Sequence, residues 1–85
     1  MNKEYVLTQH AQDVIKERGI NVLWLEQVLL SPERCEPDPT DPDLEHRLGR
    51  IFEYGNRVLR VVASRQAKPV RIVTAYFDRR IKEML

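Results

Sequence analysis

The chain has 85 residues, of which 42% are hydrophobic, and a formal net charge of +1. This length predicts one domain with a modest core. The single cysteine, Cys35, excludes an internal disulfide framework and a cysteine-based metal site, and a free thiol in a loop is favoured over a catalytic nucleophile. The sequence has no apolar run long enough to span a membrane, no signal-peptide pattern and no lipidation motif, so we expect a cytoplasmic protein.

The charges are segregated along the chain. Between residues 33 and 45 there are six acids and one base, whereas between residues 46 and 80 there are nine bases and two acids. A basic half preceded by an acidic segment suits a polyanionic ligand. It equally suits neutralisation of one half by the other within the fold.

The first predicted elements are two helices, which together cover about residues 8–30. Thr8 can cap the first helix at its N-terminus, and Gly19 can form its left-handed C-terminal cap. Asn21 can cap the second helix, which ends before Pro32 because the residue preceding a proline avoids helical geometry. Apolar residues recur at helical spacing in both segments: Leu7, Ala11, Val14 and Ile15, then Val22, Leu25, Val28 and Leu29.

One residue of these helices is less ordinary. Arg18 lies in the middle of the apolar stripe of the first helix, where a guanidinium must reach solvent, pair or face a cleft. Glu17 and Glu53 are its candidate partners. We expect Trp24 in the core between the helices.

An acidic, proline-rich loop is predicted over about residues 31–45. Its prolines favour an extended, solvated linker, with a short extra strand around residues 33–36 as an option. Its aspartates lack the glycine turn and the terminal glutamate of an EF-hand loop, so a charged linker is favoured over a calcium site. His46 follows the acids and is interpreted as part of this loop.

Three strands are predicted over about residues 46–77. The segments HRLGRIFEY, RVLRVVAS and VRIVTAYF are separated by a Gly55-Asn56 turn and by the turn RQAKP. Two hairpins in series form an antiparallel meander. The predicted fold is therefore α+β, a single domain over residues 1–85 in which two N-terminal helices pack on a three- to four-stranded antiparallel sheet.

Strand alternation divides the sheet into two faces. The apolar face, expected beneath the helices, carries Leu59, Val61, Ala63, Val73, Ala75 and Phe77. The opposite face then carries Arg60, Thr74 and Tyr76, a guanidinium with two hydroxyl groups that could bind phosphate. Solvated polar residues on one face of an antiparallel sheet are common, however, and the pattern alone favours that simpler interpretation.

Four segments carry a family resemblance: LTQHAQDVIKERGI, WLEQVLLSPE, GNRVLRVVA and RIVTAYFDRR. From Tyr5 to about Arg80, their order and spacing resemble a family of small bacterial domains of unknown function that groups with BrnT-like and RelE-like ribonuclease toxins. The resemblance implies a compact domain of the barnase/EndoU/colicin/RelE-like group. It also implies a metal-independent endoribonuclease of a toxin–antitoxin pair, with RNA and a cognate antitoxin as partners and no cofactor.

The resemblance further implies a set of site residues. Cleavage of RNA without a metal needs a base for the 2′-hydroxyl, an acid for the leaving 5′-oxygen, and cations for the phosphate charge. The implied catalytic residues are His10 as base or acid, Arg18 and Arg60 as phosphate clamps, and Thr74 and Tyr76. The candidate RNA-binding residues are Arg50, Arg71 and Arg79.

Two other functions are compatible with the same fold. One is a non-catalytic module that binds RNA or a protein on the same face. The other is an interaction domain that exposes a sheet edge for strand addition, with a homodimer as one form. The enzymatic hypothesis requires His10, Arg60 and Tyr76 to converge on one hollow.

Overall fold

Both helices begin and end where their capping residues predict. In the computed structural model, which describes residues 5–81, the helices are α1 (Gln9–Arg18) and α2 (Val22–Leu30). The side chain of Thr8 accepts a hydrogen bond from the N–H of Ala11, and Gly19 has a left-handed φ of 65°. Within the described residues, neither helix is long and apolar enough to cross a membrane.

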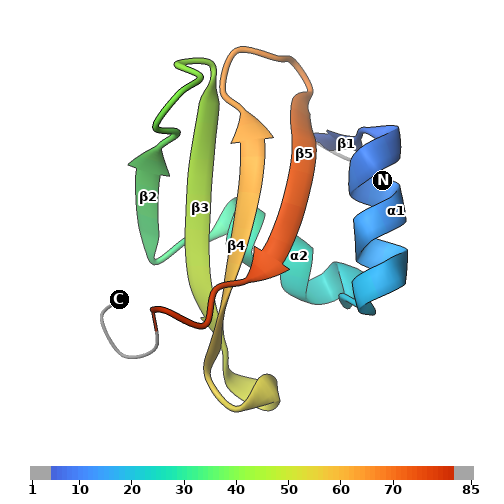
Figure 1. Ribbon diagram of the computed structural model, residues 1–85, viewed down its shortest axis with the longest axis vertical. Helices are drawn as coiled ribbons and strands as arrows, with labels where there is room; N and C mark the ends of the chain where they lie inside the picture. Colours follow the sequence, from blue (N-terminus) through green and yellow to red (C-terminus); the bar gives the residue numbers. More distant parts are fainter. Residues whose placement is uncertain (1–4, 82–85) are drawn as a thin grey trace.

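The sheet has five strands in the order β1-β5-β4-β3-β2 (Figure 1). The strand β1 runs parallel to β5, and every other neighbouring pair is antiparallel. The strands are β1 (Tyr5–Leu7), β2 (Arg34–Pro37), β3 (Leu44–Ile51), β4 (Arg57–Ser64) and β5 (Val70–Phe77).

The predicted α+β class is confirmed, but the prediction of a three- to four-stranded antiparallel sheet is wrong. The missed strand is β1, which has only three residues and so gives no readable alternation. It pairs with the start of β5 through long-range contacts that no local pattern encodes. The strand β2 lies inside the predicted linker, near the optional strand, and β3 begins at Leu44 rather than at His46.

The turn between β3 and β4 is also longer than predicted. Residues Phe52–Tyr54 form a 3-10 helix, η1, before Gly55 and Asn56, whose φ angles are 67° and 58°. The N–H of Asn56 closes the turn on the carbonyl of Ile51 at 3.0 Å. Phe52 is left 81% exposed at the tip of the hairpin.

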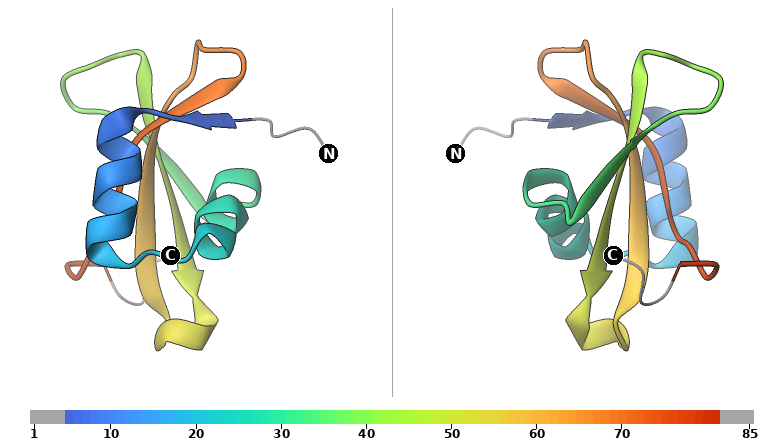
Figure 2. Two further views of the ribbon diagram at one scale, coloured as in Figure 1. Left: turned by 90° about the vertical axis from the view of Figure 1, so that its right-hand side faces the viewer. Right: turned by 90° about the vertical axis from the view of Figure 1, so that its left-hand side faces the viewer.

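Helix residues pack on the predicted apolar face of β4. The core cluster joins Leu59, Val61 and Ala63 of β4 to residues of both helices: Ala11, Ile15, Leu25, Val28 and Leu29. The helix α2 packs against β3 and β4, whereas α1 packs along β5, so each helix covers a different part of the twisted sheet (Figures 1 and 2). Gly49 permits the close approach of α2, since a Cβ there would lie 3.2 Å from Val28 Cγ2.

One residue of β5 does not lie on the face that the sequence predicts for it. The pairing of β4 with β5 is irregular between Val62 and Ala63, which leaves Val73 without a partner. This extra residue resets the alternation, so Ile72 joins the core in place of Val73.

The outer edge of β5 is partly covered by α1. Because β1 pairs only with Val70–Ile72, the carbonyl groups of β5 beyond Ile72 have no strand partner on this edge. The hydroxyl of Thr8 donates to the carbonyl of Val73 at 3.3 Å, and Arg18 Nη1 donates to the carbonyl of Ala75 at 2.8 Å. Arg18 therefore protects a sheet edge instead of pairing with Glu17 or Glu53, and two acceptors for strand addition are already occupied.

The packing of α2 predicts a contrast between two of its leucines. Leu25 is fully buried, whereas Leu23 is 70% exposed. We expect Leu25→Ala to lower the free energy of unfolding by about 2–5 kcal/mol, because it leaves a cavity in the core. The matched variant Leu23→Ala should stay within about 0.5 kcal/mol of wild type. Urea unfolding followed by circular dichroism measures both, and equal losses would contradict the assigned faces.

Candidate functional site

Polar side chains gather on the sheet face opposite the core. Arg60 lies opposite Tyr76 of β5 and Leu48 of β3, and Thr74 lies opposite Val62. The predicted placement of Arg60, Thr74 and Tyr76 on one face is therefore confirmed by the register. On the other side of β4, the pairing of His46 with Val62 places the imidazole on the same face as Arg60.

Arg60 is the centre of this face. It is only 7% exposed, and its Nε and Nη2 donate to Asp78 Oδ2 at 3.1 and 2.8 Å. Its Nη1 donates to Glu36 Oε1 at 3.1 Å. Burial acts to lower the pKa of Arg60, but the hydrogen bonds that it donates to Asp78 and Glu36 outweigh burial and raise the pKa above its usual value. The guanidinium therefore remains charged at any physiological pH.

His46 links Arg60 to the acidic loop. Its Nδ1 lies 2.9 Å from Arg60 Nη1, and its Nε2 lies 2.6 Å from Asp38 Oδ1. A guanidinium only donates, so Nδ1 must accept, and the ring proton sits on Nε2 and points at Asp38. The imidazole is therefore the neutral tautomer with its proton on Nε2, and the Asp38 carboxylate orients the ring through that nitrogen.

Asp38 is held in place by the loop that carries it. Its Oδ2 accepts hydrogen bonds from the N–H and the hydroxyl of Thr40 and from the N–H of Asp41. The hydrogen bond with His46, followed by these N–H groups, lowers the pKa of Asp38 far below its usual range. The predicted solvated linker is thus tied to the sheet, and His46 is a strand residue rather than a loop residue.

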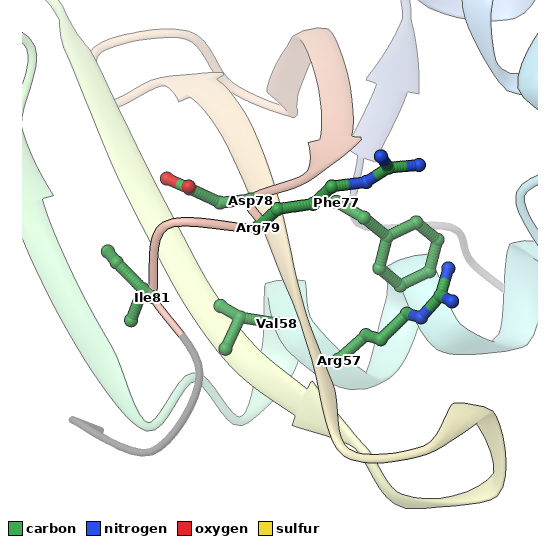
Figure 3. A pocket seen from close by; sticks show the side chains of 6 residues that line it. All are labelled: Arg57, Val58, Phe77, Asp78, Arg79 and Ile81. Carbon is green, nitrogen blue, oxygen red and sulfur yellow. The ribbon is translucent and has the colours of Figure 1, made fainter.

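Asp78 brings the chain after β5 onto the same face. Its N–H donates to the carbonyl of Val58 at 2.9 Å, and its Oδ1 accepts from the N–H of Arg80 at 3.0 Å. Burial acts to raise the pKa of Asp78, but the Arg80 N–H and the Arg60 guanidinium outweigh it and lower the pKa below its usual value. From Asp78 the chain runs across β4 toward β3 (Figure 3).

The sequence-predicted residues divide into two groups. Arg60, Thr74 and Tyr76 share the polar face, but His10 is exposed on α1, and β5 lies between α1 and the strand of Arg60 (Figure 1). Arg18 contacts the edge of β5. The expected convergence of His10 with Arg60 and Tyr76 is not seen, because α1 packs along the far edge of β5.

The three candidate RNA-binding arginines are also separated. Arg50 donates to Glu33 Oε1 from Nε at 3.0 Å and from Nη2 at 2.7 Å, and these bonds lower the pKa of Glu33. Arg71 is exposed on β5, and Arg79 is exposed just after it. Arg79 and Arg50 line two different pockets, that of Arg79 with Phe77 and Asp78 and that of Arg50 with Glu33 and Phe52.

Four residues of the network were missed from the sequence: Glu36, Asp38, His46 and Asp78. Glu36 pairs with His46 across the β2–β3 ladder, so both project to the same face. The short extra strand considered around residues 33–36 could have revealed these residues from the sequence. Its register with β3 would have placed an acid and an imidazole beside Arg60.

Neither an activated thiol at Cys35 nor a metal site in the acidic loop is found in the described residues. Cys35 is exposed on β2, and its pKa is raised by burial of the sulfur and by Glu45. A raised pKa reduces the thiolate fraction that a nucleophile needs. Among residues 5–81, no group of three His, Cys, Asp or Glu side chains is placed to hold a metal ion.

These features define a small α+β domain with a buried arginine–histidine–carboxylate network on the sheet face away from the core. The model of one protein family, described as "Domain of unknown function (DUF4258)", matches residues 7–77. The chain belongs to this family. No curated protein and no solved structure matches the chain.

The network predicts an acid-sensitive contribution to stability. Because the pKa of Asp78 is lowered in the folded state, its contribution is fully present above the unfolded value of about 4 and is lost as pH falls through the folded value. We expect Asp78→Asn to lower the free energy of unfolding at pH 7 by about 1.5–3 kcal/mol, the scale of hydrogen bonds to charged groups. The loss of stability on acidification should be smaller in the variant.

Urea unfolding between pH 7 and pH 2.5 measures both effects. Asp43→Asn, which changes an exposed carboxylate of the loop, is the matched control and should follow the wild-type curve. If Asp78→Asn and wild type lost equal stability on acidification, the assigned role of Asp78 would be wrong.

Proposed function

We propose that this domain is a metal-independent endoribonuclease that cleaves RNA by attack of the 2′-hydroxyl, with its site on the polar sheet face. One observation carries the proposal. A buried, charged guanidinium, Arg60, is in direct contact with the imidazole of His46, which a carboxylate orients from its other nitrogen. Tyr76 lies at the neighbouring position in the register. These groups are a base, an acid and a cation on one surface.

The tautomer of His46 suggests its role. With its proton on Nε2 and Asp38 bound there, Nδ1 is the basic nitrogen of His46. It would take the proton of a 2′-hydroxyl once its hydrogen bond from Arg60 is released. Asp38 would then stabilise the imidazolium that forms. The 2′-oxygen attacks phosphorus, the bond from phosphorus to the 5′-oxygen breaks, and the phenol of Tyr76 would supply a proton to the leaving oxygen.

Arg60 would stabilise the charge that collects on the phosphate. Its two carboxylate partners hold the guanidinium in place in the free domain. To reach it, a phosphate must take the place of one carboxylate. Glu36 is the more accessible partner, since its side chain is 28% exposed against 2% for Asp78.

The resemblance of four sequence segments to BrnT-like and RelE-like toxins supports this proposal from a separate direction. Under that resemblance, the domain would be the toxin of a toxin–antitoxin pair. Its partners would be RNA and a cognate antitoxin protein.

A second candidate is a non-catalytic module of the same fold that binds RNA or a protein, and one observation favours it by counting against catalysis. Both ring nitrogens of His46 and all three nitrogens of the Arg60 guanidinium already have hydrogen-bond partners within the chain. Among the described residues, no buried side-chain nitrogen or oxygen lacks a partner. A fully satisfied network is also what a purely structural role requires.

A cleavage assay separates these candidates. Wild-type protein should cut single-stranded RNA in the presence of EDTA, and both His46→Ala and Tyr76→Phe should lower the rate by about 10²-fold or more. The assay follows a short labelled RNA by gel, and thermal melting confirms that each variant is folded. His10→Ala tests the site that the resemblance implies.

Each outcome has a defined meaning. Loss of cleavage in His10→Ala with full activity in His46→Ala would move the site to α1 and overturn the sheet-face assignment. Equal activity in wild type and every variant would identify a contaminating nuclease. Salt-dependent RNA binding with no cleavage by wild type would establish the second candidate instead.

A further inference from the structure

A pocket of about 350 Å³ lies at the end of β5, beside the polar network. It is lined by Arg57 and Val58 at the start of β4 and by Phe77, Asp78, Arg79 and Ile81 at the end of the described chain. Figure 3 shows the guanidinium groups of Arg57 and Arg79 on the side of the Phe77 ring, with the Asp78 carboxylate directed away from them. The pocket thus combines an aromatic ring with two cations.

The ring in this pocket belongs to a small aromatic cluster. The Phe77 ring lies 5.0 Å from that of Tyr54 and 6.1 Å from that of Trp24, measured between centroids. The guanidinium of Arg57 stacks on the ring of Tyr54 at 4.7 Å from its centroid. This cluster holds both the Phe77 ring and the Arg57 guanidinium in place, so one side of the pocket is preorganised.

The charge of the pocket is available to a ligand. Arg50, Arg60 and Arg80 each form an ion pair with a carboxylate, but neither Arg57 nor Arg79 forms an ion pair within the described range 5–81. Asp78 is the acidic residue among those that line the pocket, and its two carboxylate oxygens already accept hydrogen bonds from Arg60 and from Arg80. The net field in the pocket is therefore positive.

We propose that this pocket binds one nucleotide of a single-stranded RNA, with the base stacked on Phe77 and its phosphate held by Arg57 and Arg79. Unpaired bases that stack on aromatic rings, with arginines on the backbone, are the usual mode of single-strand recognition. A volume of about 350 Å³ accommodates a single nucleotide. The inference deepens the proposed function and rests on it, because Asp78 joins the pocket to Arg60.

The chain carries its own reporter of binding at this site. Trp24 is the single tryptophan, and its ring contacts both Phe77 and Tyr54. We expect its fluorescence to change on titration with adenosine 5′-monophosphate. This nucleotide should bind at least about tenfold more tightly than either adenosine or inorganic phosphate, because only the nucleotide uses the ring and the arginines together.

Variants then test the two arginines. Arg57→Ala and Arg79→Ala should each weaken binding of the nucleotide and of a 2′-O-methyl RNA pentamer, which cannot be cleaved. In the double variant, the slope of log K for pentamer binding against the logarithm of the salt concentration should become less negative by about 0.7. This is the effect of one lost phosphate contact on a single strand. Arg65→Ala removes an exposed arginine at the opposite end of β4 and should change nothing.

The failure of this proposal is distinguishable from failure of the ribonuclease proposal. Nucleotide binding that depends on Arg57 and Arg79, in a protein that cuts no RNA, would support the pocket and refute the enzyme. RNA cleavage that is unaffected in both variants would leave the enzyme standing and overturn the pocket. Nucleotide binding no tighter than that of phosphate, or equal losses in Arg65→Ala, would also overturn it.

Discussion

The buried guanidinium of Arg60 is the constraint on which the polar half of this structure depends. A charged group with 7% exposure is stable only if each of its donors has a partner, since an unpaired buried charge costs several kcal/mol. Its partners come from three places in the chain: β2 supplies Glu36, β3 supplies His46, and the segment after β5 supplies Asp78. Arg60 therefore determines where the acidic loop and the chain after β5 must lie. Beneath these polar groups, Leu48, Val58 and Val62 are almost fully buried, so the network also closes a second, smaller apolar layer.

The proposed phosphate site uses the same atoms that stabilise the fold. A cation that carboxylates hold in a fixed position is well suited to meet a phosphate, because its orientation does not change during a reaction. The same carboxylates compete with that phosphate. Under this proposal, access to Arg60 depends on how easily Glu36 leaves, and Glu36 is the replaceable partner because it is partly exposed on the edge strand β2. A bound RNA would substitute for an interaction that the free domain makes internally.

The segment that follows β5 connects the network to the neighbouring pocket. Phe77, Asp78 and Arg79 all border the pocket, and Asp78 also reaches Arg60. A three-residue segment therefore contributes to two surfaces. Any shift of this segment would change the partners of Arg60 and the shape of the pocket together, which is why the two sites are expected to respond to the same ligand.

Local chemistry in the sequence was sufficient for the helices, for β4 and β5, and for the shared face of Arg60, Thr74 and Tyr76, because capping and alternation act between near neighbours. It was not sufficient for β1, whose parallel pairing with β5 spans most of the chain. Nor could it find the partners of Arg60, which lie 14, 18 and 24 residues away and depend on the register of separate strands. The irregularity at Val73 and the separation of His10 from Arg60 were likewise decided by packing. Periodicity shows which way a side chain points along its own strand, but only the assembled sheet determines what it meets there.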